Sequence, residues 1–294
     1  MPVDPTRLHI PAGTGGDGSD PLVLTPERCG WSFAGLRVVR LAAGERRAIE
    51  TGDDELAIVP LQGGCAVEVE GRRIALEGRS SVFDRVTDVV YLPSGTEAAI
   101  VADAACELAL PSAPARRRRE VAYIDAREVA VETRGAGRST RQITNFLTPE
   151  VDIPDRLSCC EVLTPPGNWS SYPPHKHDDA SNGVEAELEE IYYFRVEGPH
   201  GIAAHRTYDL VEGWDVTVTI GDGDTFLVPR GFHGPCMASP DHALWYLNVL
   251  AGPGDVRSMA ISDDPAHAWI RGAWAGQTGD PRVPMATAAG RRRP

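Results

Sequence analysis

The segment Pro174-His175-Lys176-His177 places two histidines two positions apart. Because alternate residues of a strand point to the same face, a strand here would aim both imidazoles at one point. Glu190 stands at the head of an apolar run, and His233 lies farther along the chain. Together these side chains predict a shell of three histidines and one glutamate around a metal ion. Such nitrogen and oxygen ligands suit a divalent Mn, Fe, Co, Ni or Zn ion, and the ligand types alone do not select among them.

A simpler interpretation is that the histidines lie on a solvated loop beside Asp178 and Asp179 and bind no metal. An isolated pair of histidines at this spacing would favour that interpretation. The strand that follows Glu190 and the turn Pro229-Arg-Gly-Phe-His233 favour the metal site instead.

Composition narrows the class of protein that could carry such a site. The chain has 294 residues, of which 42% are hydrophobic and 24% are charged, a composition typical of a globular protein. Its formal net charge of −13 is unfavourable for binding nucleic acid. No apolar run approaches the roughly 18 residues that a membrane span needs, and the N-terminal segment lacks the apolar core of a signal peptide. We therefore expect a cytoplasmic protein with a small-molecule substrate, six reduced cysteines and no membrane or nucleic-acid partner; a homo-oligomer is an open possibility.

Short apolar or alternating runs, separated by 30 glycines and 24 prolines, predict an all-β protein. The predicted strands are 36–41, 55–61, 65–70, 72–76, 89–92, 98–101, 107–110, 128–132, 157–163, 190–196, 214–220, 225–228 and 244–250. The proline- and arginine-rich stretch 111–120 is interpreted as a solvated linker.

The two halves of the chain look like versions of one unit. Glu55 precedes Gly63 by the same interval that separates Glu190 from Gly198, and Leu92-Pro-Ser-Gly matches Val228-Pro-Arg-Gly. This repeat predicts two β-barrels in tandem. The predicted division is an N-terminal barrel over 1–115, a C-terminal barrel over 120–270, and a loosely ordered tail over 271–294.

The motifs resemble those of the cupins. Gly167 precedes the two histidines, and Gly223 begins the second motif, which runs to His233. The interval from His177 to Glu190 is longer than the cupin pattern has, so Glu187 and Glu189 compete with Glu190 as ligands. We choose Glu190 because it heads the apolar strand and matches Glu55 in the repeat.

The stretches SYPPHKHD, EEIYYFR, VPRGFHGP and YLNVLAGP are similar to the 5-deoxy-glucuronate isomerases of myo-inositol catabolism, a bicupin family related to the 5-keto-4-deoxyuronate isomerases. The resemblance implies two double-stranded β-helix (jelly-roll) barrels. It also implies an aldose–ketose isomerase that converts 5-deoxy-D-glucuronate to 5-dehydro-2-deoxy-D-gluconate. In the N-terminal half Glu97 stands where His233 does, so the metal site is expected only in the C-terminal barrel.

For such a reaction, a bound divalent ion would polarise the carbonyl, and a positioned group would move a proton, unless a hydride shift takes its place. Glu190 and Tyr246 are the expected catalytic residues. Strand parity puts Tyr192 on the same face as Glu190, so Tyr192 is expected to contact substrate. Arg206 and Arg230 are the candidates for binding the substrate carboxylate.

Two other functions fit the same residues. An iron-dependent cupin dioxygenase could use the same ligands, and a non-enzymatic bicupin could bind a sugar acid without reaction. Lys176 is the chain's single lysine. Parity places Lys176 on the face away from the metal, where it could support a subunit contact or neutralise Asp178 and Asp179.

Overall fold

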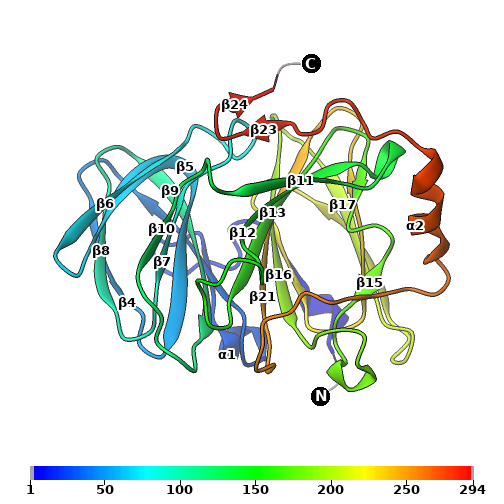
Figure 1. The fold of residues 1–294 in the computed structure, drawn as a ribbon, viewed down its shortest axis with the longest axis horizontal. Coiled ribbons are helices and arrows are strands. Elements are labelled where there is room, and N and C mark those ends of the chain that lie inside the picture. The colour runs from blue at the N-terminus through cyan, green and yellow to red at the C-terminus, as the bar shows by residue number, and fades with distance from the viewer. Residues whose placement is uncertain (1–2, 293–294) are drawn as a thin grey trace.

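The computed structural model describes residues 3–292 and consists mainly of antiparallel strands, as the sequence predicts. Two barrels lie side by side, the first drawn in blue to cyan and the second in green to orange (Figure 1). The all-β prediction is confirmed.

The first barrel is built around one long strand. Nine strands form its sheet: β2 (Leu22–Leu24), β3 (Gly35–Leu41), β4 (Arg46–Glu50), β5 (Asp54–Val69), β6 (Arg72–Arg79), β7 (Val89–Leu92), β8 (Glu97–Val101), β9 (Cys106–Pro114) and β10 (Ala122–Ile124). Strand β5 pairs with β6, β7, β8 and β9 and continues through Gly63, whose φ of +75° is accessible to glycine at little cost. The sequence predicted two separate strands here, because glycines interrupt the run. A bulge at this point bends one strand instead.

The second barrel has two facing sheets. The seven-stranded sheet has the order β1-β19-β16-β21-β13-β12-β11 and contains β1 (His9–Ile10), β11 (Ala130–Arg134), β12 (Arg141–Leu147), β13 (Ser158–Thr164), β16 (Glu189–Val196), β19 (Thr225–Val228) and β21 (Leu244–Ala251). The six-stranded sheet contains β14 (Trp169–Ser170), β15 (His175–Lys176), β17 (Ala203–Tyr208), β18 (Asp215–Ile220), β20 (Phe232–Ala238) and β22 (Ser262–Asp263).

Strand pairing crosses the predicted division of the chain in both directions. Strand β1 pairs with β19 of the second barrel, and β10 pairs with β7 of the first. The predicted linker begins inside β9, and Arg117 in its arginine run donates to the Asp155 carboxylate at 3.0 Å. The boundaries 1–115 and 120–270 stay a prediction, but β1 and β10 each pair with a strand on the other side of that division.

The remaining elements are short. They are α1 (Pro26–Cys29), α2 (Trp269–Ala273), four 3-10 turns, η1 (Pro5–Arg7), η2 (Gly137–Ser139), η3 (Ala180–Asn182) and η4 (Trp274–Gly276), and the strands β23 (Ala286–Thr287) and β24 (Gly290–Arg291). Figure 1 shows α2 on the outside of the second barrel and β23 and β24 above both barrels. Within residues 3–292, no helix has the length and apolar character to cross a membrane.

The contact between the barrels includes an apolar cluster and a buried ion pair. A single hydrophobic cluster contains buried residues of both halves, among them Leu36 and Val249. Arg79 of the first barrel donates through Nη1 to Glu161 of the second at 3.0 Å, and both side chains are buried. A buried pair of this kind must keep both partners, because either charge alone would be uncompensated.

Candidate active site

Three side chains from separate segments of the second barrel meet in its interior. His177 follows β15, Glu190 is on β16 and His233 is on β20, and their ligand atoms all lie within 4.8 Å of one another. Glu190 Oε2 is 3.0 Å from His177 Nε2 and 3.1 Å from His233 Nε2. All three residues are buried. The structure therefore brings together three of the four predicted ligands.

The fourth, His175, lies beside this group. Its ring centroid is 4.5 Å from that of His233, and the two residues are direct partners in the register of β15 and β20. The close group of three includes no atom of His175. Its Nδ1 is 3.0 Å from the carbonyl oxygen of Pro173, which leaves Nε2 as the ring nitrogen with a free lone pair.

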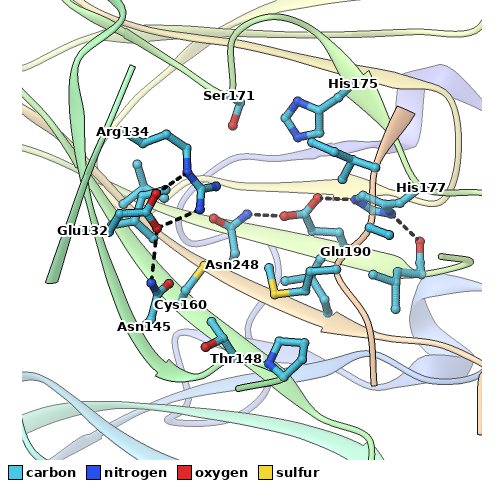
Figure 2. Close-up of a pocket in the computed structure, with 18 of the residues that line it drawn as sticks. Glu132, Arg134, Asn145, Thr148, Cys160, Ser171, His175, His177, Glu190 and Asn248 are labelled. Carbon is cyan, nitrogen blue, oxygen red and sulfur yellow. Dashed lines mark hydrogen bonds and ion pairs between the residues drawn. The ribbon is translucent and has the colours of Figure 1, made fainter. Parts of the chain in front are cut away.

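Backbone carbonyls orient the other imidazoles in the same way. His177 Nδ1 is 3.1 Å from the carbonyl oxygen of Leu188, and His233 Nδ1 is 3.5 Å from that of Gly231. An Nδ1–H that donates to a carbonyl leaves an unprotonated Nε2, as in histidines that bind metals. Glu190 is oriented as well, because Asn248 Nδ2 donates to its Oε1 (Figure 2).

This donor set fits a divalent cation. His233 Nε2 is buried and has no hydrogen-bond partner of acceptable geometry among the described residues, although Glu190 Oε2 is close to it. Two imidazole lone pairs directed at one carboxylate oxygen are satisfied by a cation among them. Burial would raise the pKa of Glu190, but the His233 and His177 imidazoles hold that pKa below its usual value, so the carboxylate is ionised.

The competing glutamates have other contacts. Glu189 accepts the backbone N–H groups of residues 32–34 of the first barrel at 2.6 to 2.9 Å. Glu187 forms an isolated bridge with Asp178 and lies outside the buried group. Among the three, Glu190 alone faces the two histidines.

The strand register corrects the predicted match between Glu190 and Glu55. Glu190 pairs with Val228, and the equivalent position in the first barrel, opposite Leu92, is occupied by Leu56. Glu55 is therefore equivalent to Glu189. Our choice of Glu190 agrees with the geometry, but the repeat that supported it is shifted by one residue.

A cavity of about 740 Å³ opens onto this group, a volume in the range of small-molecule sites. Its walls follow strand parity, because alternate residues of five adjacent strands point into it. These residues are Ala130, Glu132 and Arg134 of β11, Arg141, Ile143 and Asn145 of β12, Cys160 and Val162 of β13, Glu190 and Tyr192 of β16, and Tyr246, Asn248 and Leu250 of β21.

Both predicted tyrosines lie in this wall and share one partner. Ser171 Oγ is 3.0 Å from the Tyr246 hydroxyl and 3.2 Å from that of Tyr192. Burial raises the pKa of Tyr246 well above its usual value, so this phenol stays protonated at neutral pH. Tyr246 can therefore donate a proton or hydrogen bond, but it is poorly suited to act as a phenolate base.

Neither predicted arginine lines the cavity. Arg206 follows the buried His205 on β17, so it points outward, where it pairs with Asp215 at 2.6 Å. Arg230 pairs with Asp209 at 2.9 Å and lines a different pocket. The two arginines are engaged with carboxylates away from the candidate metal centre, and the geometry does not support their predicted role.

Sequence reasoning missed most of the cavity lining, including three polar residues that bear on the chemistry of the site. Arg134 and Arg141 line the cavity, and Asn248 lies between Arg134 and Glu190 in Figure 2. The run Arg141-Gln-Ile-Thr-Asn145 has no alternation of apolar and polar residues, so the sequence carried no clear signal for β12 or its inward face. Asn248 shares its strand face with the predicted Tyr246, so parity alone would have placed it.

Lys176 points away from the cavity, as parity predicts. Its Nζ lies 2.5 Å from both Asp178 Oδ1 and Glu185 Oε1. Glu185, rather than the predicted Asp179, is therefore its second carboxylate.

Comparison with solved structures places the fold. An IolB-like protein from Salmonella typhimurium LT2 superposes with a TM-score of 0.84 at 33% identity, covering 90% of this chain and 99% of that one. The oxalate decarboxylase of Lactobacillus farciminis is similar in fold, with a TM-score of 0.64 at 13% identity, covering 90% of this chain and 89% of that one. Fold and site together define a bicupin whose second barrel contains a buried group of two histidines and a glutamate.

Sequence relatives define the group within the bicupins. The chain belongs to the KduI/IolB family, whose profile it matches over residues 10–270. The 5-deoxy-glucuronate isomerase of Geobacillus kaustophilus is 38% identical over 90% of this chain and 95% of its own length. That of Bacillus subtilis strain 168 is 33% identical over 84% of this chain and 91% of its own length. The predicted family is confirmed, and the chain is an isomerase.

Proposed function

We propose that this protein converts 5-deoxy-D-glucuronate, an aldehyde acid, to 5-dehydro-2-deoxy-D-gluconate, a keto acid, in myo-inositol catabolism. The buried group of His177, Glu190 and His233, open to a cavity that can hold a sugar acid, carries the proposal. The names of the relatives at 33–38% identity support it.

We assign His175, His177, Glu190 and His233 to hold a divalent metal. When bound, such an ion supplies Lewis-acid polarisation of the substrate carbonyl and of the neighbouring hydroxyl. The protein's own contribution is orientation, because the Nδ1 contacts hold the imidazoles and Asn248 holds the glutamate. The ligand set accepts Mn, Fe, Co, Ni or Zn.

The first barrel is proposed to hold no such ion. Glu50 and Glu97 are direct partners between β4 and β8, as His175 and His233 are between β15 and β20. Both glutamates are exposed, and Leu56 takes the place of the glutamate ligand. The equivalent positions therefore offer no imidazole and no buried carboxylate.

The reaction moves one hydrogen between adjacent carbons and one hydroxyl proton between their oxygens, with no net change in atoms. We assign the second transfer to Tyr246, whose Oη can donate its proton to a substrate oxygen and recover one from the other oxygen. Ser171 and Tyr192 position this hydroxyl through their shared contacts.

The test is turnover of 5-deoxy-D-glucuronate by the purified protein, supplied in turn with Mn, Fe, Co, Ni and Zn and followed by NMR of the keto product. Metal-dependent formation of that product supports the proposal, and Glu190→Gln should abolish it. No turnover with any of the metals would contradict the proposal. Oxygen consumption with iron would indicate a dioxygenase instead, and saturable binding without reaction would indicate a binding protein.

A further inference from the structure

Two arginines face each other in the wall of the cavity. Arg134 on β11 and Arg141 on β12 are direct partners in the antiparallel register, and both line the cavity. Like charges directly opposite each other destabilise a sheet. The chain has a net charge of −13, but at this point of the sheet it has two adjacent cations.

Only one of the two has a carboxylate partner. Arg134 donates to Glu132 through Nε at 2.9 Å and Nη2 at 2.8 Å. Arg141 donates through Nη1 alone, to the carbonyl oxygens of Ser139 at 3.1 Å and Tyr172 at 3.4 Å. Within residues 3–292, its Nε and Nη2 have no acceptor.

Arg141 is also buried, with 5% of its surface exposed. Burial lowers the pKa of Arg141 to about 10, and the nearby Arg134 and Arg271 act in the same direction. The Trp274 ring lies 5.7 Å from the guanidinium carbon, but it offers no acceptor in the plane of the fork. A buried guanidinium whose Nε and Nη2 have no acceptor within the protein is costly unless an anion completes it.

The other arginines of the cavity are satisfied within the protein. Arg257 donates to the carbonyl oxygens of residues 147, 151 and 157, which holds those loops together. Arg271 pairs with Asp263 at 2.6 Å. Among the cavity arginines of the described residues, Arg141 is therefore the one whose guanidinium Nε and Nη2 can still bind an anion.

We propose that Arg141, with Arg134 beside it, binds the carboxylate of the substrate and so selects sugar acids over neutral sugars. The planar fork of a guanidinium matches a carboxylate with two parallel hydrogen bonds. This inference rests on the proposed function and adds the group that recognises the acid.

The position of the pair suits this role. Arg134 lies across the cavity from His177, with Asn248 and Glu190 between them (Figure 2). Because β12 and β16 are separated by two other strands, Arg141 and Glu190 belong to different parts of the wall. A substrate held at its carboxylate by the arginines therefore directs its other end toward the histidines.

The test compares 5-deoxy-D-glucuronate with 5-deoxy-D-glucose, which has a hydroxymethyl group in place of the carboxylate. Arg141→Gln should lower kcat/KM for the acid by about 10- to 100-fold, mainly through KM, and leave kcat/KM for the neutral sugar within a few-fold. Arg141→Lys, which keeps the charge but not the fork, should recover part of the loss. Arg127→Gln, a change at an exposed arginine paired with Asp125, is the control.

An equal loss for both substrates, or none for either, would overturn the assignment. So would a loss of selectivity in Arg206→Gln or Arg230→Gln with Arg141→Gln unaffected. A thermal unfolding midpoint near that of the parent protein shows that Arg141→Gln folds; if it does not, Arg141→Lys takes its place, with a smaller loss expected for the acid and none for the neutral sugar.

Binding of D-glucuronate, measured by calorimetry, separates this inference from the proposed function. If the parent protein does not isomerise 5-deoxy-D-glucuronate, the proposed function fails. Arg141→Gln should even then weaken D-glucuronate binding about 10-fold or more. Equal affinity in the two proteins would overturn the anion site.

Discussion

Glu55 and Glu189 make the same contact in opposite directions between the two barrels. The Glu55 carboxylate accepts the backbone N–H groups of residues 155–157 at 2.5 to 2.7 Å. The Glu189 carboxylate accepts those of residues 32–34 at 2.6 to 2.9 Å. Each glutamate stands near the start of a central strand, so each barrel holds a loop of the other.

Glu55→Gln should therefore destabilise the protein. Three charge-assisted bonds converge on a fully buried carboxylate, and the Tyr91 hydroxyl donates to it as well. A glutamine would turn an amino group toward some of these donors. We expect a loss of about 2–4 kcal/mol in the free energy of unfolding in urea.

The matched control for Glu55→Gln is the same change at Glu128, which is exposed and should shift stability by less than about 0.5 kcal/mol. If Glu55→Gln proved as stable as the Glu128 variant, the contacts of Glu55 with residues 155–157 would not contribute to the stability of the protein.

Much of this fold could be predicted from the sequence. Strands β7 and β19 match the predicted ranges 89–92 and 225–228, because turn residues bound short apolar runs on both sides. Strands β12, β17 and β20 were missed. The runs of β12 and β17 mix polar and charged residues with apolar ones, and Gly234-Pro235 interrupts that of β20, so hydrophobic periodicity does not mark them.

The site was predicted less completely, for a related reason. The histidines and Glu190 belong to motifs with fixed spacing, whereas Arg141 lies on a strand that was not predicted. Without that strand, the side on which Arg141 points could not be worked out. The geometry does not support the assignment of Arg206 to the substrate, because its neighbour His205 takes the inward position.

Glu190→Gln should remove the metal site while the barrel remains folded. Glutamine keeps the size of the side chain but loses the negative charge that offsets the ion. Loss of a residue that only supports a ligand typically lowers metal affinity by about 10- to 100-fold. Because Glu190 is itself a proposed ligand, we expect a larger fall in affinity for Mn²⁺ or Zn²⁺, measured by calorimetric titration. His267→Ala lies outside the buried group and serves as the control; equal losses in both variants would argue against the assigned centre.

Asn248→Ala tests the orientation of the glutamate. Asn248 Nδ2 donates to Glu190 Oε1, and the alanine variant leaves that oxygen without this partner. Metal affinity should fall by about 10- to 100-fold. Unchanged affinity in the same titration would mean that Glu190 needs no such support.

Tyr246→Phe should lower kcat without loss of metal. The phenol is protonated and faces the cavity, and a positioned acid typically contributes about 10²-fold or more to rate. Steady-state kinetics with the metal-loaded variant measures the effect. Tyr193→Phe, on the opposite face of β16, is the control. If Tyr246→Phe keeps the kcat of the parent protein, Tyr246 only packs in the wall and takes no part in the reaction.

Lys176 is expected to support the site's loop rather than the reaction. Its ammonium joins Asp178 and Glu185, and Asp178 Oδ2 in turn accepts the N–H of Gly231 at 2.7 Å, two residues before His233. Lys176→Met would leave two partly or fully buried carboxylates without their cation, at a cost of about 1–3 kcal/mol in the free energy of unfolding.

Lys176→Arg keeps that cation and should retain metal affinity and most of kcat, because the side chain points away from the cavity. Urea unfolding, metal titration and kinetics on both Lys176 variants separate the two roles. A Lys176→Arg protein that binds metal and is as stable as the parent, yet shows no turnover, would require the amine itself to take part in the reaction. We expect Lys176→Met alone to lose stability and Lys176→Arg to keep turnover. This pattern would show that Lys176 positions Asp178, which binds the turn that carries His233.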